Sequence, residues 1–340
     1  MAADVERLAG AIDAIAVDVG LSGIVRVDLD GATVIERAYG MAHRGLGVAN
    51  NGPTRFAMAS GSKLFTALAV MALVEEGAVA LDAPVRRALG SDLPMIDDRV
   101  TVEHLLAHRS GVGDYLDESE VTDWNEYLMP VPVQQLATTE QFLPVLDHLP
   151  MKFEPGERFD YSNGGYVVLA LVAERLSGVS FHDLVEQRVC VRAGMTRTAY
   201  LRSDELPGDA AVGYLHDDGL RCNVLHLPVR GNGDGGAYTT AADMHACWTS
   251  FLAGRIVSTA TAADMMRVRT DQASNGLGYG LGCWIDPVSG EVSVHGFDPG
   301  VGFVAAVAPS TGVGHTVLCN QSRGAWPASQ RIGRLVADQR

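Results

Sequence analysis

A serine and a lysine three residues apart are the side chains of this sequence best suited to chemistry. Ser60 and Lys63 lie in the stretch 56–67, where a helix is predicted to begin, so that positions i and i+3 share a face. A serine hydroxyl becomes a nucleophile when a base takes its proton, and a lysine can be that base if its pKa is depressed. Lys63 and Lys152 are the only lysines in the sequence, and the other basic side chains of the Lys/Arg class are arginines. Arginine does not lose its proton in a protein, whereas lysine can. The pattern favours a serine nucleophile with a lysine base, although an ordinary helix start with a solvated lysine has the same residues.

A second polar pair follows a Pro-Gly turn. Tyr161 and Asn163 stand between the turn at 154–157 and the apolar run 166–173. A phenol at such a place can relay a proton, and a carboxamide can hydrogen-bond a substrate amide or the lysine amine. Turn chemistry also accounts for the pair, because asparagine favours turns for its own reasons.

Together the two motifs resemble the serine hydrolase family of class C β-lactamases, D-alanyl-D-alanine carboxypeptidases, D-aminopeptidases and related carboxylesterases. Further segments in family order extend the resemblance over roughly residues 20–320, namely 39–42, 54–56, 81–85, 101–111, 153–156 and 235–243. The resemblance implies an α/β (α+β) fold of the β-lactamase/transpeptidase type. An antiparallel sheet from both chain ends, flanked by terminal helices, would carry an inserted, mainly helical domain. We expect residues 1–85 and 270–340 to form the sheet-containing domain and residues 86–269 the helical one, with the active site at their junction.

The third expected element of the site is a strand. Relatives carry Lys-Thr-Gly or His-x-Gly there with Pro-Gly a little downstream, whereas residues 292–300 read Val-Ser-Val-His-Gly-Phe-Asp-Pro-Gly. Counting back from Pro-Gly aligns Gly296 with the family glycine, places Val294 where the cation stands and leaves His295 one residue late. Because alternate strand residues face opposite sides, the register decides which of the two faces the groove, and a bulge would turn His295 inward. Relatives with His-x-Gly favour the inward histidine. A missing cation puts recognition of a substrate carboxylate in doubt, whereas neutral esters or amides lose nothing.

The resemblance implies acyl transfer through an acyl-enzyme, with no metal and no cofactor. The residues expected to be catalytic are Ser60, Lys63 and Tyr161, and those expected at the substrate or oxyanion are Asn163, His295, Gly296 and Phe297. Ser60 would attack the carbonyl, and the backbone N–H groups of Ser60 and Phe297 would hold the oxyanion. The expected substrate is a small carboxylic ester or amide, as for a carboxylesterase. A D-amino-acid peptidase or amidase, a β-lactamase, an acyltransferase and a catalytically silent scaffold or binding protein are the alternatives.

Two weaker patterns match a metal site and a dinucleotide site, but the residues around each pattern argue against such a site. His104 and His108 have the i, i+4 spacing of metal ligands, but the residue after His104 is a leucine where a metalloprotease carries its glutamate. Helix packing and capping suffice for both. Residues 231–236 satisfy G-x-G-x-x-G, yet Pro228 interrupts the preceding strand and no βαβ unit surrounds the motif.

Composition and charge limit which binding partners and which cellular compartment are expected. The 340 residues carry a formal net charge of -15 without a basic cluster, which argues against nucleic acid and anionic membranes as partners. The five cysteines are widely spaced, and reduced thiols are expected. The first residues lack the basic and apolar regions of a signal peptide, and no segment is long and apolar enough to span a bilayer, so a cytoplasmic location is expected. The oligomeric state stays open.

Periodicity and turn signals outline the elements that must position the site. Helices are expected at 4–19, 62–76, 101–108, 164–177, 180–190, 240–253 and after Pro327, and β-type segments at 23–28, 32–39, 278–285, 292–295, 302–308 and 313–318. Asp30 and Gly31 form the hairpin signal between the first two strands. The stretch 114–150 is acidic, proline-bearing and poorly periodic, and it fits either a surface excursion or a wall over the acyl pocket.

Overall fold

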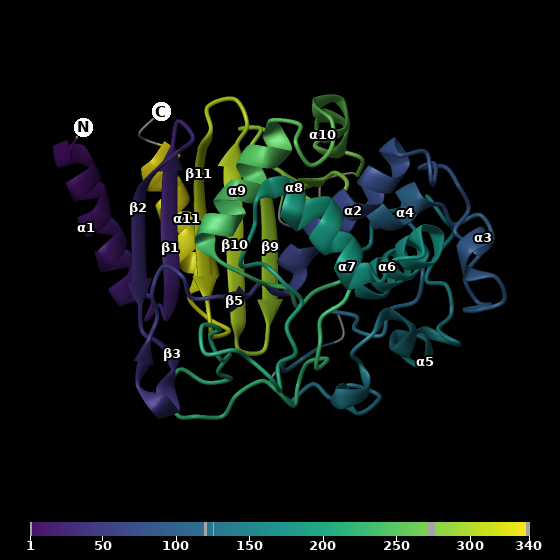
Figure 1. The fold of residues 1–340 in the computed structure, drawn as a ribbon, viewed down its shortest axis with the longest axis horizontal. Coiled ribbons are helices and arrows are strands. Elements are labelled where there is room, and N and C mark those ends of the chain that lie inside the picture. The colour runs from purple at the N-terminus through teal and green to yellow at the C-terminus, as the bar shows by residue number, and fades with distance from the viewer. Residues whose placement is uncertain (1, 119–120, 125, 271–275, 338–340) are drawn as a thin grey trace.

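The computed structural model describes residues 2–118, 121–124, 126–270 and 276–337. Its sheet-containing part and its mainly helical part lie side by side, and both chain termini are at the sheet (Figure 1). The main sheet is antiparallel, with the strand order β2-β1-β11-β10-β9-β8-β7. Its strands are β1 (Gly23–Leu29), β2 (Ala32–Tyr39), β7 (Gly278–Tyr279), β8 (Trp284–Ile285), β9 (Val292–Asp298), β10 (Val301–Ala308) and β11 (Val313–Cys319). The predicted mixed α/β class with a sheet from both chain ends is confirmed.

Two short ribbons and a series of helices complete the described chain. The ribbons pair β3 (Met41–His43) with β4 (Val48–Ala49), and β5 (Phe56–Ala57) with β6 (Tyr238–Thr239). The α-helices are α1 (Ala2–Asp18), α2 (Lys63–Glu75), α3 (Arg86–Leu89), α4 (Val102–Leu106), α5 (Leu143–Leu146), α6 (Asn163–Ser177), α7 (Phe181–Val185), α8 (Val191–Ala193), α9 (Ala241–Leu252), α10 (Thr259–Met265) and α11 (Ala325–Ala337). Short 3-10 turns occur at Arg44–Leu46, Ala59–Ser62, Val133–Gln135 and Thr139–Phe142, and Glu186–Cys190 is a π-helical turn between α7 and α8.

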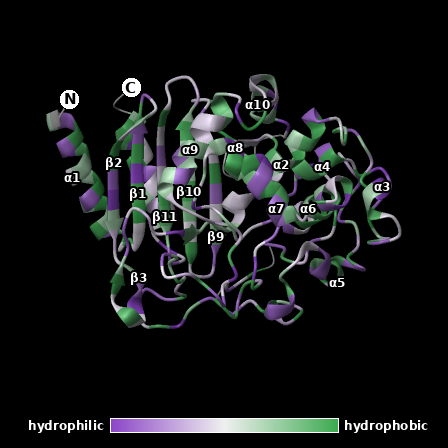
Figure 2. Cartoon of the chain, in the orientation of Figure 1, coloured by the Kyte–Doolittle hydropathy of each residue, from purple (hydrophilic) through white to green (hydrophobic). Residues whose placement is uncertain are grey.

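Alternation along the strands divides the interior into two cores. Successive strand residues face opposite sides of a sheet, so on β1 Ile24 belongs to the core shared with the helical part, whereas Val25 and Val27 belong to the other core. That second core lies between the sheet, α1 and α11. Figure 2 shows hydrophilic and hydrophobic residues alternating along α1, as expected of a helix with one face on the sheet. Helix α9, from the range 86–269, lies against β1 and β11.

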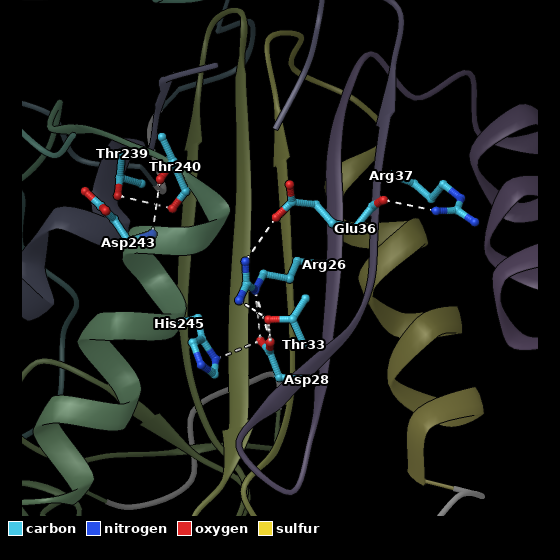
Figure 3. A network of polar contacts seen from close by, with 9 residues as sticks. All are labelled: Arg26, Asp28, Thr33, Glu36, Arg37, Thr239, Thr240, Asp243 and His245. Carbon is cyan, nitrogen blue, oxygen red and sulfur yellow. Dashed lines mark hydrogen bonds and ion pairs between the residues drawn. The ribbon is translucent and has the colours of Figure 1, made fainter. Parts of the chain in front are cut away.

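A charged network lies where β1 and β2 meet α9 (Figure 3). The Nε atom of Arg26 lies 3.0 Å from Oδ1 of Asp28, and its Nη1 atom lies 3.0 Å from Oε2 of Glu36. Thr33 donates a hydrogen bond to Asp28, and Nδ1 of His245 on α9 lies 3.2 Å from the same carboxylate. Arg26 and Asp28 are both buried. Each buried charge therefore has an opposite charge beside it, which burial requires.

Two of the differences between observed and expected helix boundaries exceed a shift of one or two residues at an end or divide a helix. Helix α11 begins at Ala325, two residues before Pro327 instead of after it. Proline is tolerated in the first turn of a helix, where its missing N–H would have no intrahelical partner. The expected helix 180–190 is divided, because the chain passes from α7 into a π-helical turn. In the described chain no single helix meets the length and apolarity needed to cross a membrane, and one bent pair, Asn163–Ser177 with Phe181–Ala193, meets them jointly.

Candidate active site

A strained 3-10 turn presents Ser60 at the start of α2. The turn spans Ala59–Ser62, and Ala59 has φ 45°, a left-handed conformation that residues other than glycine rarely adopt. Ser62 holds the turn on both sides: its Oγ donates to the Ala59 carbonyl oxygen at 2.8 Å and accepts from the Ala237 N–H at 3.0 Å. Such strain persists where the surroundings fix it, and it concentrates at functional sites.

Gly296 allows strand β9 to approach this turn. A Cβ atom built on Gly296 would lie 2.0 Å from the main-chain oxygen of Met58 and 3.0 Å from the nitrogen of Gly61. Gly61 is equally confined, since a Cβ there would lie 2.3 Å from the ring of Phe303 on β10. Two glycines thus bring β9 and β10 against the backbone that carries Ser60, which explains why β9 can line the site.

Lys63 is buried and makes three close polar contacts. Its Nζ atom lies 2.9 Å from Oγ of Ser60, 2.7 Å from Oδ1 of Asn163 and 2.7 Å from the main-chain oxygen of Asp234. A neutral amine has two hydrogens and one lone pair. The two carbonyl-type oxygens can only accept, so they take the hydrogens, and the lone pair is left for the Ser60 hydroxyl. The contacts therefore suit an amine that accepts the serine proton.

The pKa values of Lys63 and Tyr161 are shifted in complementary directions. Burial lowers the pKa of Lys63, against the opposing charges of Asp234 and Glu118. Burial raises the pKa of Tyr161 well above 10, while a hydrogen bond with Ser60 acts in the opposite sense. A lowered lysine pKa favours the base form, and a raised tyrosine pKa favours the acid form. Lys63 is therefore suited to take the Ser60 proton, and Tyr161 is suited to deliver a proton.

Aromatic rings and helix α6 fix the positions of Tyr161 and Asn163. The Tyr161 ring lies 4.3 Å from the ring of His108 and nearly parallel to the ring of Trp284, at 12°. Asn163 is the first residue of α6, and its N–H donates to Oδ2 of Asp114 at 2.6 Å. A carboxylate at a helix N-terminus is favoured by the helix dipole. Both predicted residues thus reach the same site as Ser60 and Lys63.

Two hollows meet at Ser60, and their walls differ. The more enclosed of the two, called the closed hollow below, has a volume of about 70 Å³, and the wider one, called the open hollow, has a volume of about 360 Å³. Ser60 and Glu118 line both hollows. The closed hollow is walled in part by Tyr115, Trp124, Tyr127 and Met129, which places part of the stretch 114–150 over the site. The open hollow is lined by Ser60, Glu118, Phe159, Asp160, Tyr161, Trp284, His295, Gly296, Phe297 and Trp326.

The register of β9 places His295 at the open hollow and Val294 in the core. Val294 pairs with Ala305 and is buried among core residues, whereas His295 pairs with Val304 and lines the open hollow. The pairing of β9 with β10 runs without a register shift from Asp298 to Val292, so no bulge is needed to orient the histidine. Burial lowers the pKa of His295 to about 4, which leaves the side chain neutral at pH 7. Neither residue supplies a cation at the position where relatives carry one.

Besides Glu118, two carboxylates that line the closed hollow with Ser60 were not identified from the sequence. Asp234 supplies the oxygen that Lys63 contacts, and its carboxylate accepts a hydrogen bond from the Tyr115 hydroxyl. Asp298 lines the closed hollow at the end of β9, and burial, with the negative charge of Asp234, raises its pKa to about 8. Asp234 lies in the glycine-rich segment 231–236, and Asp298 lies in the segment 292–300 that ends in Pro-Gly. The residue spacing of neither segment indicates that its aspartate lies at the site.

The histidines His104 and His108 have structural roles. Oγ of Thr101 accepts from the His104 N–H at 3.2 Å, and the His104 ring accepts from the Thr101 N–H, which closes a capping box on α4. Nδ1 of His108 accepts the Ser162 N–H at 3.0 Å. Within the described chain no group of three His, Cys, Asp or Glu side chains is arranged to hold a metal ion.

Comparison with known proteins places the fold and the site in context. The family model described as Beta-lactamase matches residues 8–338. The crystal structure of a penicillin binding protein from Bacillus halodurans superposes with a TM-score of 0.89 and 37% identity, covering 95% of this chain and 99% of that chain.

Two curated relatives differ in their activities. Esterase EstB from Burkholderia gladioli is 33% identical over 202 residues, or 55% of this chain and 48% of EstB. The D-aminopeptidase from Brucella anthropi is 29% identical over 239 residues, or 68% of this chain and 42% of that protein. The chain thus spans less than half the length of either relative.

Proposed function

This chain belongs to the Beta-lactamase family of serine hydrolases, and we propose that it hydrolyses small carboxylic esters through an acyl-enzyme on Ser60. The observation that carries the proposal is the contact of 2.9 Å between Nζ of Lys63 and Oγ of Ser60, with the amine buried and its other two contacts made to acceptors. This arrangement supports proton transfer from the hydroxyl to the amine as the serine attacks a carbonyl. Neither step calls for a metal or cofactor.

The proposed reaction uses the two hollows for the two halves of the substrate. The leaving group must take up a proton as it departs, so it leaves on the side where a proton donor lies within reach. Tyr161 lines the open hollow, and Lys63 lies beside it, with Nζ 4.9 Å from the centre of the Tyr161 ring. We therefore assign the leaving group to the open hollow and the acyl group to the smaller closed hollow, which favours short acyl groups.

The oxyanion is assigned to the backbone N–H groups of Ser60 and Phe297. Gly296 supports this assignment, because the strand that carries Phe297 approaches the Ser60 turn at that residue. Hydrogen-bond donors that point at the developing charge are worth several kcal/mol, about 3 kcal/mol for one donor. Asn163 would hold Lys63 in place and contact the acyl group.

An ester is favoured over a β-lactam because neither Val294 nor His295, the two β9 residues considered for this position, supplies a cation. Val294 is buried in the core and His295 is held neutral by burial, so neither can pair with the carboxylate of a penicillin or of a D-alanyl peptide. Amidase action on substrates with a free amino group is a second candidate, because the closed hollow carries the carboxylates of Glu118 and Asp234. Substrates with amine-bearing acyl groups can be compared directly with substrates that have simple short acyl groups.

A substrate panel tests the proposal. We expect kcat/KM for p-nitrophenyl butyrate to exceed that for nitrocefin by at least about 100-fold, the scale of one lost charge-assisted contact in a buried site. Hydrolysis of D-alanine p-nitroanilide tests the second candidate, amidase action on substrates with a free amino group. A fluorophosphonate should add one adduct to the parent chain and none to Ser60→Ala. A higher kcat/KM for nitrocefin would favour a β-lactamase, and an adduct on Ser60→Ala would exclude Ser60 as the nucleophile.

A further inference from the structure

Aromatic rings form one wall of the open hollow. The rings of Tyr161 and Trp284 are inclined by 12° with centroids 6.0 Å apart, and those of Trp284 and His295 by 16° with centroids 6.1 Å apart. The ring of Trp326 on α11 stands nearly edge-on to His295, at 68° and 4.5 Å. Trp326 is 37% exposed, so part of its indole surface faces solvent at the mouth of the hollow.

The charge of the open hollow is negative. Its lining contains two carboxylates, Glu118 and Asp160, and no lysine or arginine among the described residues. Asp160 is paired with Lys152 at 3.3 Å, whereas the contact of Glu118 is to the neutral amide of Asn163, at 3.2 Å. Glu118 is exposed, so its charge faces the space that a substrate enters.

Aromatic faces and an unpaired carboxylate together favour one class of ligand. The face of an aromatic ring attracts a cation, tryptophan most strongly, and quaternary ammonium groups are bound in sites of this kind. The chain as a whole has a formal net charge of -15, which raises the local concentration of cations and repels anions. A neutral aromatic group would gain from the rings but nothing from the charge.

We propose, resting on the hydrolase function proposed above, that the leaving group carries an alkylammonium cation, which Trp284, Trp326 and Glu118 hold in the open hollow. The cation takes no part in the chemistry. The bond between the acyl carbon and Oγ of Ser60 forms, the bond from that carbon to the leaving oxygen or sulfur breaks, and the leaving atom takes the serine proton through Lys63 and Tyr161. Water then splits the acyl-enzyme, giving the free carboxylic acid and returning the proton to Ser60.

Two thioesters that differ only in the presence of a cation test the proposal. Butyrylthiocholine and S-(3,3-dimethylbutyl) thiobutyrate have the same shape, but only the first has a cation. Each kcat/KM is divided by the rate constant for alkaline hydrolysis of the same ester, which removes the difference in leaving-group ability. We expect the corrected kcat/KM of butyrylthiocholine to be at least about 10-fold higher, and the preference to shrink with rising salt.

Two variants locate the preference in the hollow. Trp326→Leu keeps apolar bulk but removes the ring, and Glu118→Gln removes the charge but keeps an oxygen for Asn163. Each should lower the preference by about 3- to 10-fold, mainly through KM. Glu6→Gln on α1, an exposed residue at the far side of the sheet, makes the same change in net charge and should leave the preference as it is. Equal corrected values for the two esters in the parent, or equal losses in Glu6→Gln and Glu118→Gln, would overturn the proposal.

A binding measurement separates this proposal from the proposed function. Choline and 3,3-dimethylbutan-1-ol form the matching pair without a scissile bond, and each is tested for slowing the fluorophosphonate labelling of Ser60. Protection by choline alone supports the cation site even if neither thioester is hydrolysed, a result that would contradict the esterase proposal only. Equal protection by both compounds, or by the alcohol alone, would overturn the cation site while leaving ester hydrolysis intact.

Discussion

The Nζ atom of Lys63 lies 2.7 Å from the main-chain oxygen of Asp234, although the two residues are 171 positions apart in the sequence. This contact, with that to Asn163, occupies two directions around the amine and leaves the third for Ser60. The base is therefore oriented by two segments from other parts of the chain, and the pairing with the serine is set by more than the spacing of one helical turn.

Lys63→Arg should be nearly as inactive as Lys63→Ala. The guanidinium keeps a positive charge at the site but does not give up its proton, so it cannot act as a base. The measurement is kcat/KM for p-nitrophenyl butyrate, with circular dichroism to show that both variants fold. Lys152→Arg, at the other lysine of the chain, is the matched control and should retain activity. If Lys63→Arg kept most of its activity, the lysine would serve as a fixed charge only.

Tyr161→Phe should lower kcat by roughly two to four orders of magnitude, the range for loss of a general acid or base. The ring would still stack between His108 and Trp284, so the fold and the binding of substrate should change little. Tyr39→Phe, which removes a hydroxyl on β2 remote from Ser60, is the control and should leave kcat unchanged. A Tyr161→Phe variant with full kcat would assign the proton transfer to Lys63 alone.

Asp28→Asn should destabilise the protein at neutral pH by about 3 kcal/mol, because it leaves buried Arg26 with fewer countercharges. Burial tends to raise the pKa of Asp28, but the hydrogen bond from His245 and the charge of Arg26 outweigh it, and the pKa lies below the ordinary 3.8. The stabilisation is therefore present above about pH 4 and is lost as the pH falls through the folded pKa. Urea unfolding at pH 7 and pH 3 should show the gap between parent and variant closing in acid. A gap of constant size would contradict this network as its source.

Asp298→Asn should stabilise the protein at pH 8 more than at pH 4. Burial and the charge of Asp234 raise the pKa of Asp298 to about 8, so the folded chain keeps a proton that the unfolded chain loses near pH 4. The parent therefore loses stability between those two pH values, and the asparagine variant does not. Urea midpoints at pH 4, 6 and 8 measure the difference. A difference independent of pH would show that the carboxyl titrates normally in the folded protein.

The parts of the site that the sequence predicts are the locally encoded ones. Ser60 and Lys63 follow from a single helical turn, and the strand predicted at 292–295, observed as β9 (Val292–Asp298), follows from its apolar pattern. Asp234 and Trp326 could not be assigned in this way, because loop packing and the return of the last helix bring them to Ser60 from distant parts of the chain. The register of His295 likewise depends on pairing with β10, which a single strand does not encode.

His295→Ala should change the binding of the leaving group without changing the pH dependence of the reaction. The histidine lines the open hollow beside Trp284 and Trp326, so its loss removes a contact surface and should raise KM for esters with a large leaving group. Burial lowers its pKa to about 4, so the histidine stays neutral from pH 5.5 to 9. Profiles of kcat against pH for the parent and the variant on p-nitrophenyl butyrate should therefore run parallel over that range. If an inflection near pH 6 to 7 were present in the parent and absent from the variant, His295 would take part in proton transfer, and the leaving group would have a donor besides Tyr161.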